Sequence, residues 1–264
     1  MEIQDIPSRA LAETIFKRSG FYNLYERRLE SQIIRNSLPN HIAIILDGNR
    51  RWARERRLPT LEGHRRGLNA VIEISKKARQ MGIKILTVWV FSTENWDRSK
   101  AEVNYIMKLG ERAVANYLKE ALKEQVRIIH IGRKDRIPNN LRDKLREAEE
   151  KTKKFSKYFF VIALDFGGRD DIIRAIKKIR NPQSVIKNLD EISFSQFLDT
   201  KKLPQSDIDL VIRTGGEIRT SGFMIWQAAY AEYIFVKKYM PDFTPEDFEE
   251  CIKEYSQRQR RFGR

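Results

Sequence analysis

The chain has 264 residues, with 51 Lys and Arg against 36 Asp and Glu, so its formal net charge at pH 7 is +15. A chain of this length can bury a full hydrophobic core, and its single cysteine, Cys251, excludes an internal disulfide or a cysteine-rich zinc site. Its apolar runs are far shorter than the roughly 18 residues of a membrane-spanning helix. We therefore expect a cytoplasmic protein with anionic partners: nucleic acid, phosphorylated small molecules or a membrane surface.

The first 40 residues differ from the rest of the chain. Residues 1–36 have no clear apolar periodicity, and the sequence LPN that follows at 38–40 breaks regular structure. We interpret residues 1–40 as an extension that is helical or partly ordered, and residues 41–264 as a single α/β domain.

Short β-branched runs alternate with longer helical stretches from residue 41 onward. The runs cover residues 42–46, 84–91, 126–131, 158–164, 208–212 and 233–236. Strands that alternate with helices predict a central parallel sheet, here of about six strands surrounded by helices. Ligands of such sheets bind beyond the carboxyl ends of the strands, so the polar residues that follow each run are the candidates for a functional site.

The first polar cluster follows run 42–46. It contains Asp47, Gly48, Asn49, Arg50, Arg51 and Trp52. A carboxylate beside two guanidinium groups can hold Mg²⁺ together with a diphosphate, since Mg²⁺ prefers oxygen ligands that it shares with phosphate. The alternative is a plain Asp-Gly turn with solvated arginines.

The second cluster, FSTENWDR, follows run 84–91. It contains Ser92, Thr93, Glu94, Asn95, Trp96 and Arg98. Either Ser92 or Thr93 could cap a helix, and Ser99 with Glu102 fits a structural capping box for the amphipathic helix predicted at 100–123. Capping leaves the other polar residues of the cluster unexplained. The apolar stripe of helix 100–123 either packs in the core or lines an apolar cavity.

The third cluster follows run 208–212. Its polar residues are Arg213, Arg219, Thr220 and Ser221, with a glycine pair between them and an apolar helix expected after them. Arginines, hydroxyls and the free N–H groups of a helix start would form an anion cradle. Glu232 opens the last apolar run, and His64 lies among arginines at a helix start, as a phosphate contact or a cap.

The remaining conspicuous residues have structural interpretations. His41 and His130 flank strands. The sequence DFGGRDD at 165–171 lacks the companion motifs of a kinase, and its Asp170 and Asp171 suit a strand-to-helix turn with acidic residues at the helix N-terminus.

Taken in order, the motifs HIAIILDGNRRWA, GH at 63–64, FSTENWDR, DFGGRDDI, DLVIRTGGEIRTSGF and WQAAYAEYIF resemble one family, the cis-prenyltransferases typified by undecaprenyl diphosphate synthase. The resemblance extends from His41 to Gly263. It implies a parallel sheet around an apolar tunnel, a homodimer, and repeated addition of isopentenyl diphosphate to an allylic diphosphate primer. The product would be a long-chain polyprenyl diphosphate for lipid glycosyl carriers, delivered by peripheral contact with a membrane.

The resemblance also implies roles for individual residues. Asp47 would hold Mg²⁺ on the allylic diphosphate, with Glu232 completing the metal site from the same or a neighbouring subunit. Asn95 would assist proton removal. The other implied substrate-binding residues are Gly48, Asn49, Arg50, Arg51, Trp52, His64, Ser92, Thr93, Glu94, Trp96, Arg98, Arg213, Arg219, Thr220 and Ser221.

Two departures from the family pattern concern a phosphate contact and the primer. Thr60 stands where bacterial members carry a basic residue, so Arg56 or Arg57 would supply that phosphate contact. The DGNRR form is similar to the archaeal and eukaryotic branches, and archaeal relatives start from geranylgeranyl rather than farnesyl diphosphate.

Two other functions compete with this interpretation. A nucleic-acid-binding module would use the +15 charge and the basic tail RQRRFGR, but a polyanion-binding surface gains little from Asp47, Glu94 and Glu232. A catalytically silent subunit of the same fold would lack the aspartate of DGN, which this chain has, and the tail RFG at 261–263 matches the R-x-G ending of active members. We therefore expect an enzyme that does not bind nucleic acid.

Overall fold

The structure, a computed structural model, describes residues 38–180 and 189–258. Almost all of the expected N-terminal extension and of the basic tail, including the R-x-G ending, lies outside these residues.

The core of the molecule is one six-stranded sheet in the order β3-β4-β2-β1-β5-β6, and every neighbouring pair is parallel. This confirms the predicted fold class. The strands are β1 (His41–Ile45), β2 (Ile85–Ser92), β3 (Val126–Ile131), β4 (Tyr158–Phe166), β5 (Leu210–Arg213) and β6 (Glu232–Phe235). Strands β1, β3, β4 and β5 are almost entirely buried, as their continuous apolar sequences predict, whereas only Ile234 of the edge strand β6 is fully buried.

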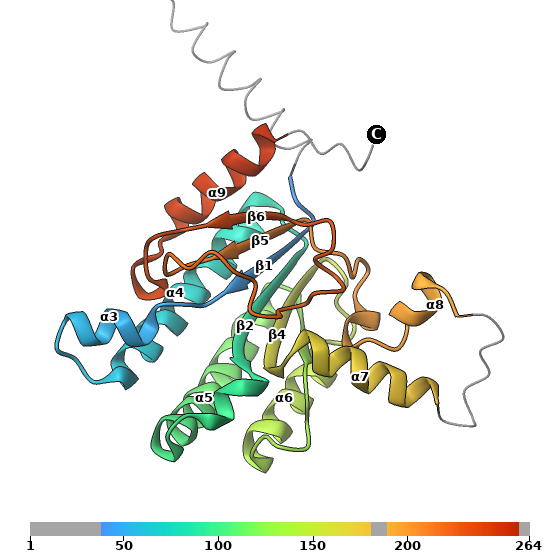
Figure 1. Ribbon diagram of the computed structural model, residues 1–264, viewed down its shortest axis with the longest axis horizontal. Helices are drawn as coiled ribbons and strands as arrows, with labels where there is room; N and C mark the ends of the chain where they lie inside the picture. Colours follow the sequence, from blue (N-terminus) through green and yellow to red (C-terminus); the bar gives the residue numbers. More distant parts are fainter. Residues whose placement is uncertain (1–37, 181–188, 259–264) are drawn as a thin grey trace, which may run out of the picture.

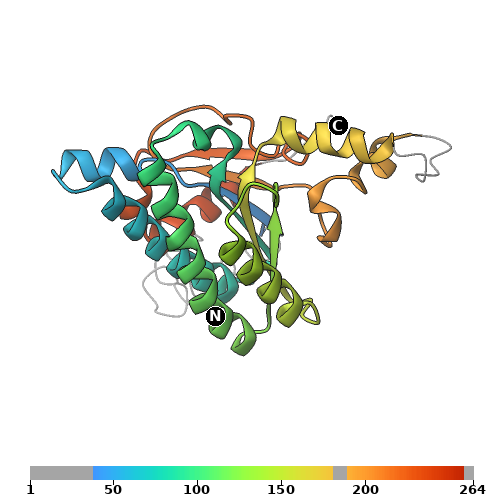
Figure 2. The same cartoon turned by 90° about the horizontal axis from the view of Figure 1, so that it is seen from below.

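The α-helices of the described part are α3 (Asn49–Glu55), α4 (Thr60–Met81), α5 (Lys100–Lys123), α6 (Asn139–Thr152), α7 (Gly168–Ile179), α8 (Glu191–Ser195) and α9 (Pro245–Gln257), and the 3₁₀ turns are η1 (Thr93–Asp97), η2 (Asp199–Lys202) and η3 (Met240–Asp242). Helices α4, α5, α6 and α9 cover one face of the sheet (Figures 1 and 2). Side chains of α4, α5, α6 and α9 form the larger apolar cluster with one face of the strands. The opposite face packs against residues of the segment 203–228.

Helix α5 begins where the sequence predicts, at the cap residue Ser99, whose hydroxyl accepts a hydrogen bond from the backbone N–H of Glu102 at 3.3 Å. The second half of the expected capping box, a hydrogen bond from the Ser99 backbone N–H to the Glu102 carboxylate, is wrong. The Glu102 carboxylate does not return to the cap and instead binds three basic side chains of the site described below.

The expected apolar helix after Ser221 is also wrong. Residues 221–230 form successive turns, and Ser221, Gly222 and Met224 have φ values of 52°, 79° and 43°. Left-handed residues so close together are incompatible with a right-handed helix. The anion cradle expected here therefore has no helix N-terminus.

Within the two described ranges, no helix is both long enough and apolar enough to cross a membrane.

Candidate active site

A cleft of about 810 Å³ opens at the carboxyl ends of β1, β2 and β5. It lies where the sheet order places β5 beside β1, which is the position expected for ligands of an open parallel sheet. Twelve of the residues selected from the sequence line it: Asp47, Gly48, Asn49, Arg50, Arg51, His64, Ser92, Asn95, Arg98, Arg213, Arg219 and Ser221.

Asp47 is the one carboxylate among the described residues that line the cleft, and seven arginines line it too. Its Oδ2 accepts a hydrogen bond from Arg213 Nη2 at 2.8 Å, and its Oδ1 lies 3.2 Å from Arg51 Nη2. Partial burial opposes ionisation of Asp47. The hydrogen bond and charge of Arg213, the Gly48 N–H and the charge of Arg51 outweigh it and lower the pKa of Asp47 below its usual range. The side chain is therefore an anion at neutral pH.

Two contacts fix the backbone after β1: the close packing of Gly48 against Tyr239, and the hydrogen bonds of the Thr214 hydroxyl with the Asp47 backbone. Gly48 has a φ of 99°, and a Cβ at this position would lie 2.4 Å from Tyr239 Cδ1. The glycine is thus required by its backbone conformation and by the closeness of Tyr239. The Thr214 hydroxyl joins the loops after β1 and β5, because it accepts from the Asp47 N–H at 3.0 Å and lies 2.8 Å from the Asp47 carbonyl oxygen.

Arg213 is the most deeply buried cation of the cleft, with 5% of the residue exposed. Its Nη1 donates to Ser221 Oγ at 2.9 Å and to the Arg219 carbonyl oxygen. Its Nε is buried and has no partner among the described residues. A buried guanidinium N–H without an acceptor is costly, so this atom is a donor available to an anionic ligand.

The end of β2 and the loop after it present three of their predicted residues to the cleft, Ser92, Asn95 and Arg98. The Asn95 amide oxygen accepts from the Ser92 N–H at 3.1 Å, which closes the η1 turn. Trp96 does not line the cleft and donates its Nε1–H to Asp165 Oδ1 at 2.9 Å. Asp165 is fully buried and also bound by Arg136, so the tryptophan anchors the loop to the end of β4.

Glu94 and Thr93 also lie outside the cleft lining, and the Thr93 hydroxyl donates to Glu94 Oε1 at 2.9 Å. Burial opposes ionisation of Glu94, but hydrogen bonds from Thr93 and Ser92 lower its pKa. Thr220 is likewise absent from the lining.

Glu102 is the functional residue that the sequence interpretation missed. Its Oε1 lies 3.0 Å from His64 Nε2, 3.2 Å from Arg98 Nη1 and 3.7 Å from Arg50 Nε. Its carboxylate thus joins three side chains of the cleft. The signal in the sequence was an acidic residue four positions after Arg98 on the buried face of a helix.

His64 is not a helix cap but lies inside α4, in its second turn. Burial lowers its pKa below the usual value, against the raising effect of Glu102 and with the help of the charges of Arg98 and Arg50. The imidazole is therefore neutral at pH 7.

Trp52 does not reach the cleft. It is 4% exposed, and its Nε1–H donates to Asp242 Oδ1 at 2.7 Å. Arg56 stacks on its ring and pairs with Asp242, so it cannot replace the basic residue expected at Thr60. Arg57 lines the cleft beside Thr60, and so does Arg54.

Glu232 is not brought together with Asp47 in one chain. In the register of β5 and β6 it pairs with Leu210, three residues before Arg213, so it lies toward the amino end of the sheet. Its carboxylate binds Arg258 Nη1 at 2.8 Å. Across the described residues, no group of three or more His, Cys, Asp or Glu side chains could hold a metal ion by itself.

An apolar cavity of about 100 Å³ adjoins the cleft. Its walls come from α4, α5, α6 and the strands between them, so part of the apolar stripe of α5 lines a cavity. Leu46, Asn49, His64 and Val90 line both the cleft and the cavity, which therefore adjoin one another.

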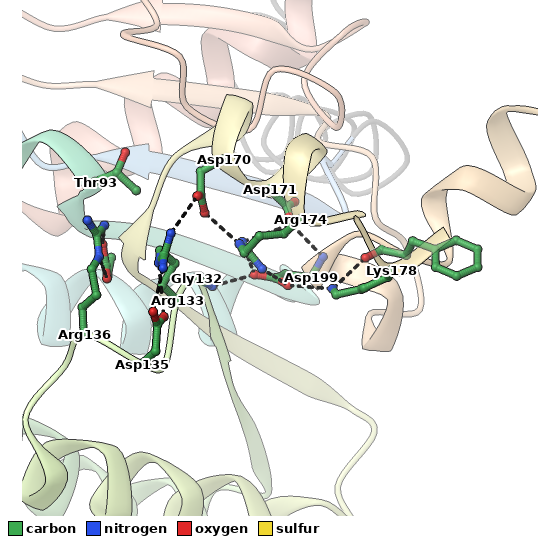
Figure 3. A network of polar contacts seen from close by, with 12 residues as sticks. Thr93, Gly132, Arg133, Asp135, Arg136, Asp170, Asp171, Arg174, Lys178 and Asp199 are labelled. Atoms are coloured by element: carbon green, nitrogen blue, oxygen red, sulfur yellow. Dashed lines mark hydrogen bonds and ion pairs between the residues drawn. The ribbon is translucent and has the colours of Figure 1, made fainter. Parts of the chain in front are cut away.

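A second cluster of Asp and Arg side chains lies between α7, η2 and the loop after β3 (Figure 3). Arg174 donates from Nε to Asp170 at 2.7 Å and from Nη1 and Nη2 to Asp199, both at 2.7 Å. Asp171 accepts from the Asp199 N–H at 3.1 Å. Burial and the neighbouring Asp199 raise the pKa of Asp171 to about 6.

A cationic cleft with one carboxylate, next to an apolar cavity, fits an enzyme that holds a phosphorylated head group at one end and an apolar chain at the other. Comparison with known proteins identifies which enzymes of this class the chain resembles.

The protein family described as "Putative undecaprenyl diphosphate synthase" matches residues 45–263. A tritrans,polycis-undecaprenyl-diphosphate synthase (geranylgeranyl-diphosphate specific) from Pyrococcus furiosus is 43% identical over 249 residues, which are 92% of this chain and 94% of the relative. A farnesyl-diphosphate-specific undecaprenyl-diphosphate synthase from Micrococcus luteus is also 43% identical, over 86% of this chain and 92% of the relative.

Among solved structures, lavandulyl diphosphate synthase from Lavandula x intermedia, in complex with dimethylallyl diphosphate, superposes with a TM-score of 0.84. It is 36% identical and covers 87% of this chain and 100% of that structure. The chain therefore belongs to the undecaprenyl diphosphate synthase family of cis-prenyltransferases. It is a prenyltransferase that makes a polyprenyl diphosphate, which confirms the predicted family and enzyme class. Archaeal and bacterial relatives match equally well, so the likeness of the DGNRR motif to the archaeal branch does not select the primer.

Proposed function

We propose that the enzyme condenses isopentenyl diphosphate repeatedly onto an allylic diphosphate primer, geranylgeranyl or farnesyl diphosphate, to make the precursor of a lipid glycosyl carrier. One observation carries this proposal: the Asp47–Arg213 pair lies in a cleft that adjoins an apolar cavity. A substrate with a diphosphate head group and an apolar chain needs a cationic cleft and an apolar cavity side by side. The catalytic domain would comprise residues 41–264, with 1–40 as an extension, and the enzyme would work in the cytoplasm with peripheral membrane contact.

The cleft suits a Mg²⁺–diphosphate complex. Mg²⁺ is usually bound through one or two carboxylates together with substrate phosphates, and Asp47 is an ionised carboxylate that faces the cleft. When bound, the ion would neutralise charge that develops on the leaving diphosphate. Arg50 and Arg51 would hold the allylic diphosphate beside it, with the Asn49 amide and neutral His64.

The isopentenyl diphosphate would bind at Arg213, Arg219 and Ser221. The buried Nε of Arg213 has no internal acceptor, which fits a phosphate oxygen as its partner. Asn95 at the cleft wall would assist proton removal from the isopentenyl unit. The adjoining apolar cavity would keep water from the allylic carbon as positive charge develops there.

We infer that the enzyme is a homodimer. Three of the most exposed large apolar side chains, Ile192, Ile218 and Tyr230, are 79%, 78% and 78% exposed, and two of them lie in the loop that carries Arg219. Solvent-exposed apolar side chains of this size favour a protein interface. In such a dimer Glu232 would have to serve a metal site of the other subunit, since it does not approach Asp47 of its own chain.

The proposal is tested by incubating the full chain with Mg²⁺, radiolabelled isopentenyl diphosphate and one allylic primer at a time. We expect a ladder of polyprenyl diphosphates from geranylgeranyl or farnesyl diphosphate, and no product after chelation of the metal. Absence of label incorporation with every primer would contradict the proposal.

A further inference from the structure

A basic groove of about 880 Å³ lies at the opposite end of the sheet from the cleft. It is formed by the C-terminal ends of α4 and α5 and the start of β4. Its charged residues are five cations and two carboxylates: Lys76, Arg79, Lys119, Lys123, Lys157, Glu120 and Glu124. None of them belongs to the candidate active site.

The groove is separated from the apolar cavity by one layer of side chains. Tyr117 lines the cavity and packs on Phe160, with ring centroids 4.7 Å apart. The Tyr117 hydroxyl accepts a hydrogen bond from Arg79 Nη1 at 3.0 Å, and Arg79 lines the groove, where it pairs with Glu120. The far end of the cavity is therefore closed by Tyr117, with Arg79 behind it.

Two features of the groove, its uncompensated charge and its position beside the cavity, favour a binding role. Within the described residues no carboxylate lies at ion-pair distance from Lys119 or Lys123, so both ammonium groups are available to an anionic partner, and Lys157 contacts only the Tyr158 ring, 5.1 Å from its centroid. The groove also adjoins the one side of the cavity that is remote from the diphosphate cleft. A chain that lengthens in a cavity of about 100 Å³ must soon displace the wall at this side.

We propose that this groove docks the enzyme on a membrane that contains anionic phospholipids, at the place where the growing polyprenyl chain leaves the cavity past Tyr117. The inference rests on the proposed function, because it assumes an apolar product. The ammonium groups attract lipid phosphates, and the apolar chain passes from the cavity to the bilayer with little exposure to water.

The experiment uses the full chain and vesicles of phosphatidylcholine with or without phosphatidylglycerol. The wild type is expected to sediment with the anionic vesicles alone. The double variant Lys119→Glu/Lys123→Glu should bind them at least ~10-fold more weakly, because two attractive charges become repulsive. The matched control is Lys201→Glu/Lys202→Glu on η2, which carries the same charge change next to Leu203 of the other apolar cluster and should bind as the wild type does.

Equal losses in both double variants, or equal wild-type binding to both kinds of vesicle, would overturn the proposal. Product release gives a second readout: labelled product should transfer to anionic vesicles more slowly from Lys119→Glu/Lys123→Glu than from the wild type. Equal transfer rates would refute the exit at this groove. Label incorporation in detergent without vesicles should be the same for all three proteins, whereas failure of the proposed function would abolish it in every medium.

Discussion

Two clusters of Asp and Arg side chains lie toward the carboxyl edge of the same sheet, and they differ in the ratio of arginines to carboxylates. In the cleft, seven arginines share the lining with Asp47, and their other carboxylate partners are Glu102 for Arg50 and Arg98 and Glu217 for Arg51 and Arg219. The arginines thus outnumber the carboxylates, and a buried N–H of Arg213 has no acceptor among the described residues. In the second cluster, all three guanidinium nitrogens of Arg174 donate hydrogen bonds to carboxylates, and Asp199 also accepts from the Gly132 N–H at 2.8 Å (Figure 3).

The comparison shows what distinguishes a binding site from a structural ion cluster built of the same residues. The second cluster is internally saturated, so it joins α7, η2 and the loop after β3 and has little capacity for a ligand. The cleft has an excess of cationic donors that an added anion can satisfy. Substitutions in the cleft should therefore change catalysis, whereas those in the second cluster should change stability.

The largest expected effect is that of Asp47→Asn. The variant keeps the shape of the side chain but removes the charge, so isopentenyl incorporation should fall by about 10²–10³-fold, with a far-ultraviolet circular dichroism spectrum like that of the wild type. The matched control is Asp170→Asn in the second cluster, which should retain the wild-type rate per folded molecule. Comparable losses of activity in the two variants would remove the distinction between the clusters.

Asp171 should make stability depend on pH without affecting the reaction. Its pKa is raised from 3.8 to about 6, so the folded protein holds this proton more tightly than the unfolded chain. The wild type therefore loses stability relative to Asp171→Asn as the pH rises from about 4 to about 6, by at most about 3 kcal/mol, and the difference is constant above that range. Urea unfolding of both proteins across this pH range measures the difference in their free energies of unfolding. If the wild type gained stability relative to Asp171→Asn as the pH rose, the burial argument would be contradicted.

The same substitution in the two clusters gives a direct comparison. Arg213→Lys should lower kcat/KM by roughly 10-fold or more, because lysine lacks the planar fork that binds Asp47 and a phosphate together. Arg174→Lys should leave kcat/KM unchanged and lower the free energy of unfolding by about 2 kcal/mol, because it loses charged hydrogen bonds to Asp170 and Asp199. Steady-state kinetics and chemical denaturation of both variants would show the reverse pattern if the assignment of the clusters is wrong.

The smallest of these effects is expected for Glu102→Gln. The neutral amide can still contact His64 but no longer attracts Arg98 and Arg50, so both arginines should become less ordered and the KM for the primer should rise several-fold, about 1 kcal/mol in binding. The pKa of His64, followed by NMR, should fall further below its usual range, because Glu102 is a group that raises it. A KM equal to that of the wild type would assign Glu102 to stability, with the second cluster.

The sequence predicted the sheet and the residues at strand ends well. Apolar runs mark buried strands, so Asp47 and Arg213, which lie at the ends of two such runs, had to meet at one edge of a parallel sheet. The direction of side chains within short helices and turns could not be predicted from the sequence. Trp52 in α3 and Trp96 in η1 point away from the cleft because each finds a carboxylate partner from a distant segment, Asp242 or Asp165.

Two further misjudgements have physical reasons. Glu102 matched the spacing of a capping box, and spacing does not reveal that basic side chains from two other elements would compete for its carboxylate. Glu232 opens its strand, and in a parallel sheet the first residue of a strand lies at the edge opposite to the ligand site. That placement could have been inferred from the sequence alone.

The hydrogen bond between Asp47 and Arg213 joins positions 166 residues apart in the chain. Because β5 is among the last strands to be made, a chain still emerging from the ribosome has every arginine of α3 in place but no complete diphosphate pocket until translation has passed Arg213. Substrate capture is thereby postponed to the end of synthesis, because a chain that ends before β5 contains every residue that lines the apolar cavity but lacks Arg213.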